Sequence, residues 1–269
     1  MAIYEYIGYK KTFEFDRIKK PYKISKDFSI VVPSYNEDEN LKPLIRELKK
    51  VMAKTKFKSS YEIIIVDDNS NGKTREILKN FAKNGNFIAL LRNKKGIFTA
   101  VLDGIKIANG KYILTMDADL SHPPHLIPKM LSYINDYDIV IGSRYSKGGE
   151  MKSTFTRKWG GFFLNKICSF IIGTKVKDLG GNFRIFKKSA IDKIKFRYPC
   201  KFAEFGQELF YRAERLNFKI KEVPFIYRDR KEGKSKIGNI PIKQAIHYLK
   251  RAFQLKRENK YGAAELKDL

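Results

Sequence analysis

The chain alternates short apolar segments with segments of helical periodicity between residues 28 and 143, and this alternation constrains the fold more than any other feature. A continuous run of β-branched residues, such as EIIIV at 62–66, is typical of a strand that is buried on both faces. Between such runs, apolar residues recur at spacings of three and four, as over 41–56. Further strands are predicted at 28–32, 86–91, 111–116 and 138–143, and further helices at 74–81, 98–108 and 126–134. Strands that alternate with helices predict an α/β fold whose mostly parallel, doubly wound sheet is flanked by helices.

Beyond residue 145 the pattern becomes mixed. Helices are predicted at 159–172, 205–216 and 240–258, and strands at 182–186 and 219–227. The last of these helices is amphipathic. No internal repeat, low-complexity tract or linker rich in Pro, Gly and Ser divides the chain. We therefore expect an N-terminal extension at 1–27 and a single domain at 28–269, with halves at about 28–145 and 146–269.

The charge of the chain narrows the classes of partner. The 269 residues include 55 Lys and Arg against 29 Asp and Glu, which gives a net charge of +26. Such a field attracts polyanions, including nucleic acid, an anionic membrane surface or a phosphorylated substrate.

The two cysteines, Cys168 and Cys200, are too few for a disulfide framework, so reduced thiols are expected. The longest apolar stretch, 161–173, is shorter than the about 20 residues that a membrane span needs. The N-terminus lacks the pattern of a signal peptide. The sequence predicts a soluble or peripheral protein inside the cell.

Polar clusters follow four of the predicted strands. They are SYNE at 34–37, DDNS at 67–70, DAD at 117–119 and GSRY at 142–145. Ligands of open parallel sheets bind beyond the carboxyl ends of the strands, and those ends meet at one edge. Four polar loops at one edge therefore predict a single ligand site.

The DAD cluster is the most specific of the four. Asp117 and Asp119 lie at a strand end, where two carboxylates can face one divalent cation, and Mg²⁺ commonly completes its shell with substrate phosphates. In a chain this basic, carboxylates gathered at the ligand edge favour a metal that bridges to a diphosphate. A solvated acidic turn is the alternative. His122 follows closely, either as a further ligand or as part of a rigid helix start among prolines.

The DDNS cluster has two interpretations. Its carboxylates can hydrogen-bond a base or ribose, and Tyr35, Asn36 and Glu37 can pack beside the same base. Alternatively, Asn69 or Ser70 caps the following helix, and Asn36 or Asp38 caps the helix after SYNE.

Seven segments together resemble family 2 glycosyltransferases of the GT-A fold, and within them the dolichol-phosphate mannosyltransferase group. The combination of DADLSHPP, GSRY, GGNFR and a DRxxGxSK pattern is specific to polyprenyl-phosphate sugar transferases. The matching segments are VVPSYNE (31–37), IIIVDDNS (63–70), GKYILTMDADLSHPP (110–124), VIGSRY (140–145), KDLGGNFRIFKK (177–188), FGQELFYRAERLNFKIKEVPF (205–225) and DRKEGKSKI (229–237).

The resemblance implies a role for each matching site residue. Mg²⁺ or Mn²⁺ and the donor diphosphate are expected at Asp117 and Asp119. The residues expected to bind the nucleotide sugar are Pro33, Tyr35, Glu37, Asp68, Asp117, Ala118 and Asp119. Those expected to meet phosphates of the donor or of the lipid acceptor are Arg144, Arg157, Arg230 and Lys236. Gln207 and Glu208 are expected to border the acceptor site, and the residues expected to be catalytic are Asp119, Arg144 and Arg230.

The activity that the resemblance implies is inverting transfer of a hexose to dolichyl or another polyprenyl phosphate, with mannose from GDP-mannose as the expected sugar. The protein would act peripherally on the cytoplasmic face of a membrane, with or without a membrane-anchoring subunit. UDP-glucose as donor is the alternative within the same architecture. A nucleic-acid-binding protein is the alternative from another class, but no binding motif appears and the basic residues are spread along the chain. No nucleic acid partner is therefore expected.

Two positions depart from the pattern of the relatives. Phe98 stands in the loop at 96–100 where relatives usually carry a small residue, and Asn182 stands where many relatives place an aromatic residue directly after glycine. The QxxRW motif of polysaccharide synthases is also missing. A hydroxyl acceptor needs a general base, whereas a lipid phosphate is already largely anionic at neutral pH.

Two segments are candidates for contact with a membrane. The helix at 240–258 has an apolar face flanked by cations, and such a helix either lies in a membrane interface or packs on its own domain. The apolar segment at 159–172 is the second candidate. The apolar face consists of Ile242, Ala245, Ile246, Leu249, Ala252 and Phe253, and the cations include Lys250, Arg251, Lys256 and Arg257.

Overall fold

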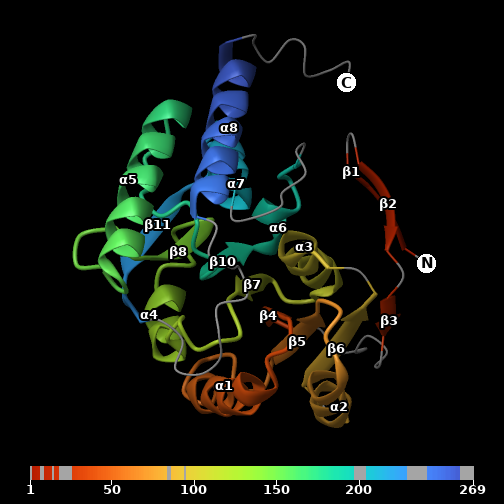
Figure 1. Ribbon diagram of the computed structural model, residues 1–269. Helices are drawn as coiled ribbons and strands as arrows, with labels where there is room; N and C mark the ends of the chain where they lie inside the picture. Colours follow the sequence, from red (N-terminus) through yellow and green to blue (C-terminus); the bar gives the residue numbers. More distant parts are fainter. Residues whose placement is uncertain are drawn as a thin grey trace.

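The computed structural model describes residues 2–6, 9–13, 15–17, 26–83, 86–93, 95–196, 204–228 and 241–260. Its centre is an eight-stranded sheet with the strand order β11-β8-β10-β7-β4-β5-β6-β3 (Figure 1). The strands are β3 (Phe15–Arg17), β4 (Phe28–Ser34), β5 (Tyr61–Asp67), β6 (Phe87–Arg92), β7 (Tyr112–Thr115), β8 (Ile139–Ser143), β10 (Arg184–Lys187) and β11 (Ile220–Pro224). Strands β6, β5, β4 and β7 pair in parallel, as do β8 and β11. The predicted mostly parallel sheet is confirmed.

One interior strand runs against the others. Strand β10 lies antiparallel between β7 and β8, and Arg184 at its start pairs with Thr115 near the end of β7 and with Ile141 on β8. The residues that precede β10 therefore arrive at the carboxyl ends of the parallel strands. The segment at 178–183 therefore lies at the same edge of the sheet as the polar loops.

Helices cover both faces of the sheet. They are α1 (Asp38–Met52), α2 (Gly72–Phe81), α3 (Ile97–Ile107), α4 (Ile127–Leu131), α5 (Phe155–Ile172), α6 (Lys188–Ile191), α7 (Phe205–Arg215) and α8 (Pro241–Lys260). Alternate residues of β5 enter two different cores: Ile63 and Ile65 pack with α1 and α4, whereas Ile64 and Val66 pack with α3. Figure 1 shows α5, α7 and α8 grouped away from α1 and α2. The apolar runs of the sequence are therefore strands buried on both faces, as predicted.

Short strands complete the structure. Strands β1 (Ala2–Tyr6) and β2 (Tyr9–Phe13) form a hairpin, and β9 (Glu150–Lys152) pairs in parallel with β12 (Ile226–Arg228). Strand β3 lies within the segment interpreted as an N-terminal extension, and it joins the main sheet antiparallel to β6. The boundary at residue 28 and the division into halves stay predictions. The strand expected over 219–227 is two strands, because β11 pairs with β8 and β12 with β9.

The C-terminal helix packs on the domain with part of its surface. Tyr248, Ala252 and Leu255 of α8 are buried in the core that α5 and α7 share, whereas Ile242 and Phe253 are exposed. Within the described residues, no helix has both the length and the apolar character required to cross a membrane.

Candidate active site

The loops after β4 and β5 are tied together by hydrogen bonds at the carboxyl edge of the sheet. The Asp68 amide donates to the Ser34 carbonyl at 2.8 Å. The Asn36 amide donates to Ser70 Oγ at 2.9 Å, and the Asn71 amide donates to Asn36 Oδ1 at 2.9 Å. Asn36, at φ 50°, turns the first loop back toward the second. The SYNE and DDNS clusters therefore lie side by side and form one continuous surface at this edge.

Three residues expected to bind nucleotide lie at the end of β4 or in the loop that follows it. Pro33 is in β4, Tyr35 follows it, and Glu37 immediately precedes α1. Glu37 is buried and its Oε2 accepts from Asn40 Nδ2 at 2.7 Å, so it fixes the start of the helix. Lys95 Nζ lies 4.2 Å from the centroid of the Tyr35 ring and also contacts the Tyr35 hydroxyl. Tyr35 thus meets the loop that precedes α3.

Asp68 follows β5 and is held by that same loop. Its two carboxylate oxygens accept from the Gly96 amide at 2.9 and 2.8 Å, and Arg92 forms an ion pair with it at 2.5 Å. Burial raises the pKa of Asp68, and the Gly96 hydrogen bond and the Arg92 charge oppose that rise only in part. The residue that precedes α2 is Asn71, whereas Ser70 Oγ accepts from the Asn36 amide and Asn69 Oδ1 accepts from Arg75, so the capping interpretation of DDNS is not supported.

The acidic loop after β7 folds back on itself. Asp117 Oδ1 accepts from Asn182 Nδ2 at 3.0 Å, and Asp119 Oδ1 accepts from the Ser121 amide at 3.1 Å. Leu120 adopts φ 61°, a left-handed conformation uncommon for a branched residue. Ala118, between the two aspartates, is buried in the core. The loop is therefore rigid, and its carboxylates have defined positions.

His122 stabilises the conformation of this loop. The Asp117 amide donates to His122 Nδ1 at 3.0 Å, so this nitrogen is an acceptor. The imidazole stacks on Phe183 with 5.2 Å between ring centroids, and burial lowers its pKa, which favours the neutral form. With Nδ1 already occupied, the structure favours the interpretation that His122 fixes the loop.

The acidic loop fits a hard divalent cation that takes part of its shell from a substrate. Asp117 and Asp119 supply carboxylate oxygens, the ligand type that Mg²⁺ and Mn²⁺ prefer. Within the described ranges, no group of three or more His, Cys, Asp and Glu side chains is arranged to hold a metal ion. Two protein carboxylates plus substrate phosphates and water are the usual ligand set of Mg²⁺ at phosphate sites.

Arg144, which follows β8, is clamped by a buried carboxylate. Its Nε and a terminal nitrogen donate to the two oxygens of Asp178 at 2.8 and 2.7 Å, and its amide also donates to Asp178 at 2.9 Å. Burial alone would raise the pKa of Asp178, but the charge and hydrogen bonds of Arg144 outweigh it and hold the pKa below its usual value. The guanidinium of Arg144 is thereby fixed in one orientation.

Arg157 shares an aromatic neighbour with Arg144. It is exposed on α5 and donates to the Tyr227 hydroxyl at 3.4 Å. Its guanidinium carbon lies 5.9 Å from the centroid of the Tyr227 ring, and that of Arg144 lies 5.6 Å from the same centroid. Two of the predicted phosphate-binding residues therefore meet at one tyrosine on β12.

The remaining predicted acceptor residues are buried or outside the described part. Gln207 is fully buried in α7. Glu208 is also fully buried, and it bonds Arg212 at 2.8 Å and Arg251 of α8 at 3.1 Å. Arg230 and Lys236 lie outside the described residues. The structure thus brings Asp68, Asp117, Asp119 and Arg144 to strand ends and places Arg157 on α5 beside Tyr227, whereas Gln207 and Glu208 lie in the interior.

Sequence reasoning missed three contributors: Asp178 and Asn182 before β10, and Arg92 at the end of β6. The first two lie in KDLGGNFR, a segment recognised only as a motif, and their contact with Arg144 and Asp117 depends on the antiparallel course of β10.

The two departures from the family pattern also have structural explanations. Asn182 bonds the acidic loop, and Phe98 packs 4.6 Å from Phe205 between ring centroids in the core beneath α7.

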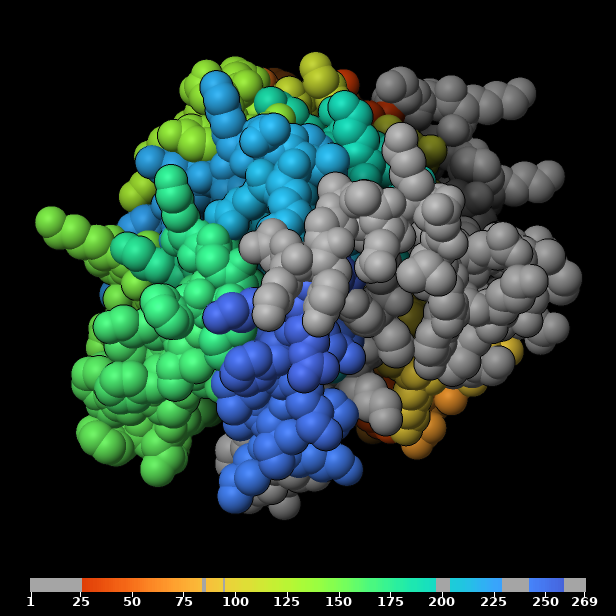
Figure 2. Space-filling view, turned by 90° about the horizontal axis from the view of Figure 1, so that it is seen from above, coloured from red at the N-terminus to blue at the C-terminus, as the bar shows by residue number. Residues whose placement is uncertain are grey.

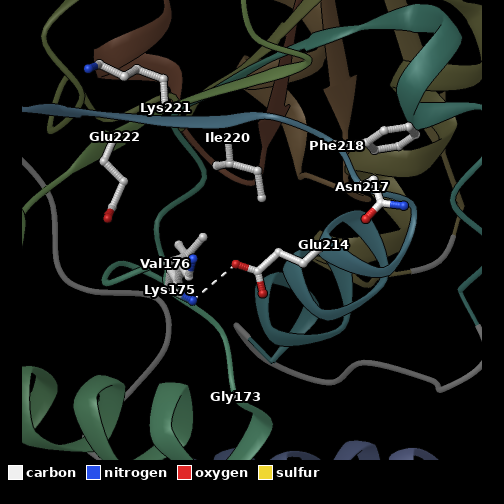
Figure 3. A pocket seen from close by; sticks show the side chains of 9 residues that line it. All are labelled: Gly173, Lys175, Val176, Glu214, Asn217, Phe218, Ile220, Lys221 and Glu222. Atoms are coloured by element: carbon white, nitrogen blue, oxygen red, sulfur yellow. Dashed lines mark hydrogen bonds between the residues drawn. The ribbon is translucent and has the colours of Figure 1, made fainter.

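A cavity of about 610 Å³ lies elsewhere, along β11 (Figure 3). Figure 3 shows Glu214 from α7 facing Lys175, whose amide donates to Glu214 Oε1 at 3.1 Å. The other lining residues are Gly173, Val176, Asn217, Phe218, Ile220, Lys221 and Glu222. None of the residues predicted for the site lines this cavity, so it does not form part of the candidate active site.

Comparison with known proteins identifies the family. The model of glycosyl transferase family 2 matches residues 29–195, so the chain belongs to this family. A dolichol-phosphate mannosyltransferase of Pyrococcus furiosus is 33% identical over 233 residues, which cover 84% of this chain and 63% of that protein. A dolichol-phosphate mannosyltransferase of Saccharomyces cerevisiae is 29% identical over 262 residues, which cover 90% of this chain and 91% of that protein.

A solved structure supports the fold. Glucosyl-3-phosphoglycerate synthase of Mycobacterium tuberculosis, in complex with Mn²⁺, UDP and glucosyl-3-phosphoglycerate, superposes with a TM-score of 0.61 at 14% sequence identity. The match covers 84% of this chain and 80% of that one. The chain spans less than two thirds of the Pyrococcus relative but nearly all of the yeast one. The architecture is that of GT-A glycosyltransferases.

Replacing Asp178 by Asn tests the clamp on Arg144. Removing one charge of a buried pair leaves the other uncompensated, so we expect Asp178→Asn to lower the free energy of unfolding by about 3 kcal/mol. The matched control is Asp192→Asn, which removes an exposed pair with Lys188 on α6 and should cost less than about 0.5 kcal/mol. Urea unfolding of both variants at neutral pH measures the difference. Equal stability of the two variants would show that the buried pair contributes nothing.

Proposed function

We propose that this chain transfers a sugar from a nucleoside diphosphate sugar to the phosphate of a polyprenyl phosphate such as dolichyl phosphate. The family supports glycosyl transfer, and the names of the two relatives support a polyprenyl phosphate as acceptor. Mannose from GDP-mannose is the proposed donor, since both relatives are mannosyltransferases. UDP-glucose is the competing donor. It is assayed as well, because the glucosyl-3-phosphoglycerate synthase structure contains UDP.

The observation that carries this proposal is the arrangement of opposite charges at the carboxyl ends of two nearby parallel strands. Asp117 and Asp119 follow β7, whereas Arg144 follows β8, and only β10 separates these two strands. The carboxylates of the acidic loop can bind a divalent cation that carries a diphosphate. The two arginines can bind a phosphate group of a second substrate. A donor with a diphosphate and an acceptor with a monophosphate match this arrangement.

The residues would act by position and charge. Bound at Asp117 and Asp119, Mg²⁺ or Mn²⁺ would neutralise the nucleoside diphosphate as it leaves. Asp68, Pro33, Tyr35 and Glu37 would hold the nucleoside. Arg144 would orient the acceptor phosphate for in-line attack on the anomeric carbon, which inverts its configuration.

The acceptor phosphate needs no protein base. A phosphate monoester has a second pKa of about 6, so its oxygen is anionic at neutral pH. Arg157 would add a second positive charge beside Tyr227, and Arg230 and Lys236 are proposed to add further cations. The arginines therefore bind the nucleophile without having to remove a proton from it.

An assay with labelled donors tests the proposed reaction. GDP-mannose and UDP-glucose are each incubated with dolichyl phosphate and Mn²⁺, and label in the lipid fraction is counted. We expect mannose transfer, and a loss of at least about 10²-fold in Asp119→Asn, because one charged ligand of the cation is gone. Asp136→Asn is the control, since Asp136 is an exposed carboxylate at the opposite end of the strands.

Three results would contradict parts of this proposal. Glucose transfer in place of mannose transfer would replace the donor. No label in lipid from either donor would reject the reaction. Full activity of wild type in EDTA, or of Asp119→Asn, would reject the metal at the acidic loop.

We also propose that α5 and α8 rest on the membrane that contains the acceptor. Apolar side chains on α5 are spaced three or four residues apart and are exposed, with Phe170 at 84%. They are Phe155, Trp159, Phe163, Ile167 and Phe170. Arg157 of the phosphate site lies on the same helix, so an acceptor phosphate bound there is held close to α5.

The charges of the two helices fit an anionic surface. Helix α5 contains no acidic residue, and α8 contains Glu258 as its single acidic residue. Figure 2 shows the green segment of α5 and the blue segment of α8 side by side on one face. Of the cations expected around the apolar face of α8, Lys250, Lys256 and Arg257 are exposed, whereas Arg251 is buried against Glu208.

Co-sedimentation with vesicles tests the membrane contact. We expect the wild type to pellet with vesicles that contain phosphatidylserine, and the double variant Phe163→Ser, Phe170→Ser to remain largely in the supernatant because it loses apolar anchors. The control is Leu216→Ser, an exposed apolar residue at the end of α7. If the wild type stays in the supernatant at low salt, a separate anchoring subunit must bring it to the membrane.

A further inference from the structure

A buried charge cluster lies behind Asp68. Arg92, the last residue of β6, is 2% exposed. Its guanidinium forms an ion pair with Asp68 Oδ1 at 2.5 Å on one side, and on the other its Nε lies 3.0 Å from Asp103 Oδ2 of α3. Asp103 is 4% exposed and is not among the residues expected to touch a ligand. One arginine thus joins a site carboxylate to a carboxylate in the core.

Arg92 also holds the loop that closes on Asp68. It donates to the Gly96 carbonyl at 3.0 Å and to Thr99 Oγ1 at 2.5 Å. Thr99 Oγ1 in turn donates to the Gly96 carbonyl at 2.8 Å, and the Gly96 amide donates to Asp68. The position of Arg92 therefore determines the position of both Asp68 and the Gly96 loop.

Helix α3 fixes Asp103 in place. Gly104, the next residue, packs so closely on β4 that an added Cβ would lie 2.3 Å from Val31 Cγ1. The helix cannot move away from the sheet without losing that contact, and the Asp103 carboxylate stays directed at Arg92. Asp103 thus connects the rigid contact between α3 and the sheet to the loops of the candidate active site.

We infer that Asp103 is a positioning residue of the donor site: through Arg92 it holds Asp68 and the Gly96 loop in the arrangement that receives the nucleoside. The inference rests on the proposed function, because it assumes that Asp68 and its loop meet the donor. Without the Asp103 charge, Arg92 keeps a single buried counter-ion and is drawn toward Asp68. Asp68 then has less capacity to accept hydrogen bonds from a nucleoside.

The ionisation of Asp103 offers an independent readout. Burial raises its pKa to about 6, although Arg92 and Lys106 act to lower it, and Asp68 adds to the rise. Arg92 of β6, Lys106 of α3 and Asp68 after β5 are the charged groups that face it. The carboxylate is mostly charged above about pH 6 and becomes progressively neutral below it, so that it then resembles the side chain in Asp103→Asn. Nucleotide affinity of the wild type should therefore fall between pH 7.5 and 5.

Calorimetric titration of the full chain with GDP and with UDP, in Mn²⁺ at pH 7.5, tests the inference. We expect Asp103→Asn to weaken binding of the preferred nucleotide about tenfold and to raise the donor KM by a similar factor. The kcat at saturating donor and the KM for the lipid phosphate should change little. The variant should also show a smaller difference in affinity between pH 7.5 and 5 than the wild type, because only the part caused by protonation of the terminal phosphate of the nucleotide remains.

The matched control is Glu62→Gln. Glu62 is a fully buried carboxylate near the start of β5, where it accepts from Ser29 at 2.6 Å and from the Asn109 amide at 2.8 Å. It resembles Asp103 in burial but lies at the opposite end of the strands. If Glu62→Gln loses stability and keeps nucleotide affinity, a loss of affinity in Asp103→Asn is specific to the donor site.

The outcomes separate the inference from the proposed function. If the wild type binds neither GDP nor UDP, the proposed function is overturned. If the wild type binds and a folded Asp103→Asn binds equally well, the positioning role is overturned. Should Asp103→Asn fail to fold, Thr99→Ala removes another support of Arg92 and keeps both carboxylates. Unchanged affinity in Thr99→Ala would then overturn the positioning role, and weaker affinity would support it.

Discussion

The antiparallel pairing of β10 between β7 and β8 is the constraint on which the candidate active site depends. Parallel strands alone would bring the loops after β4, β5, β7 and β8 to one edge, as in any doubly wound sheet. Because β10 runs the opposite way, the segment before it enters the same edge and delivers Asp178 and Asn182. These two side chains bind Arg144 and Asp117. One reversed strand thus supports both the acidic loop and the arginine.

Electrostatics at this edge differ from those of the chain as a whole. The whole chain has a net charge of +26, whereas buried carboxylates gather at the strand ends. Asp68 and Asp178 are paired with arginines, and Asp119 accepts from a backbone amide. Removing one partner of such a pair is costly, because the other charge remains buried. The same pairs therefore maintain the fold and keep the side chains of the site in fixed orientations.

Much of the fold and part of the site could be predicted from the sequence. Runs such as EIIIV indicated strands buried on both faces, and the helices that follow them were found to within a few residues. The position of Asp68, Asp117, Asp119 and Arg144 at one edge followed from the predicted parallel strands, whose carboxyl ends meet there. The family assignment is confirmed by the match over residues 29–195.

What could not be predicted depends on contacts between distant segments. Asp178 lies 34 residues from Arg144 in sequence, and Asp68 lies 24 residues from Arg92, so no local periodicity indicates these pairs. Gln207 and Glu208 belong to a specific motif, yet their burial follows from how α7 packs beneath α5 and α8. The contact of Arg251 could not be predicted either, because the basic pattern of the C-terminal helix does not indicate that one of its cations faces the buried Glu208.

The position of the bound cation tests the central claim most directly. In a crystal of the protein grown with Mn²⁺ and a nucleoside diphosphate, we expect the anomalous manganese peak within about 2.3 Å of carboxylate oxygens of the acidic loop, with the diphosphate supplying the remaining ligands. Arg144 should remain paired with Asp178 in that crystal. Manganese bound elsewhere, with Asp117 and Asp119 in contact with solvent alone, would contradict the account.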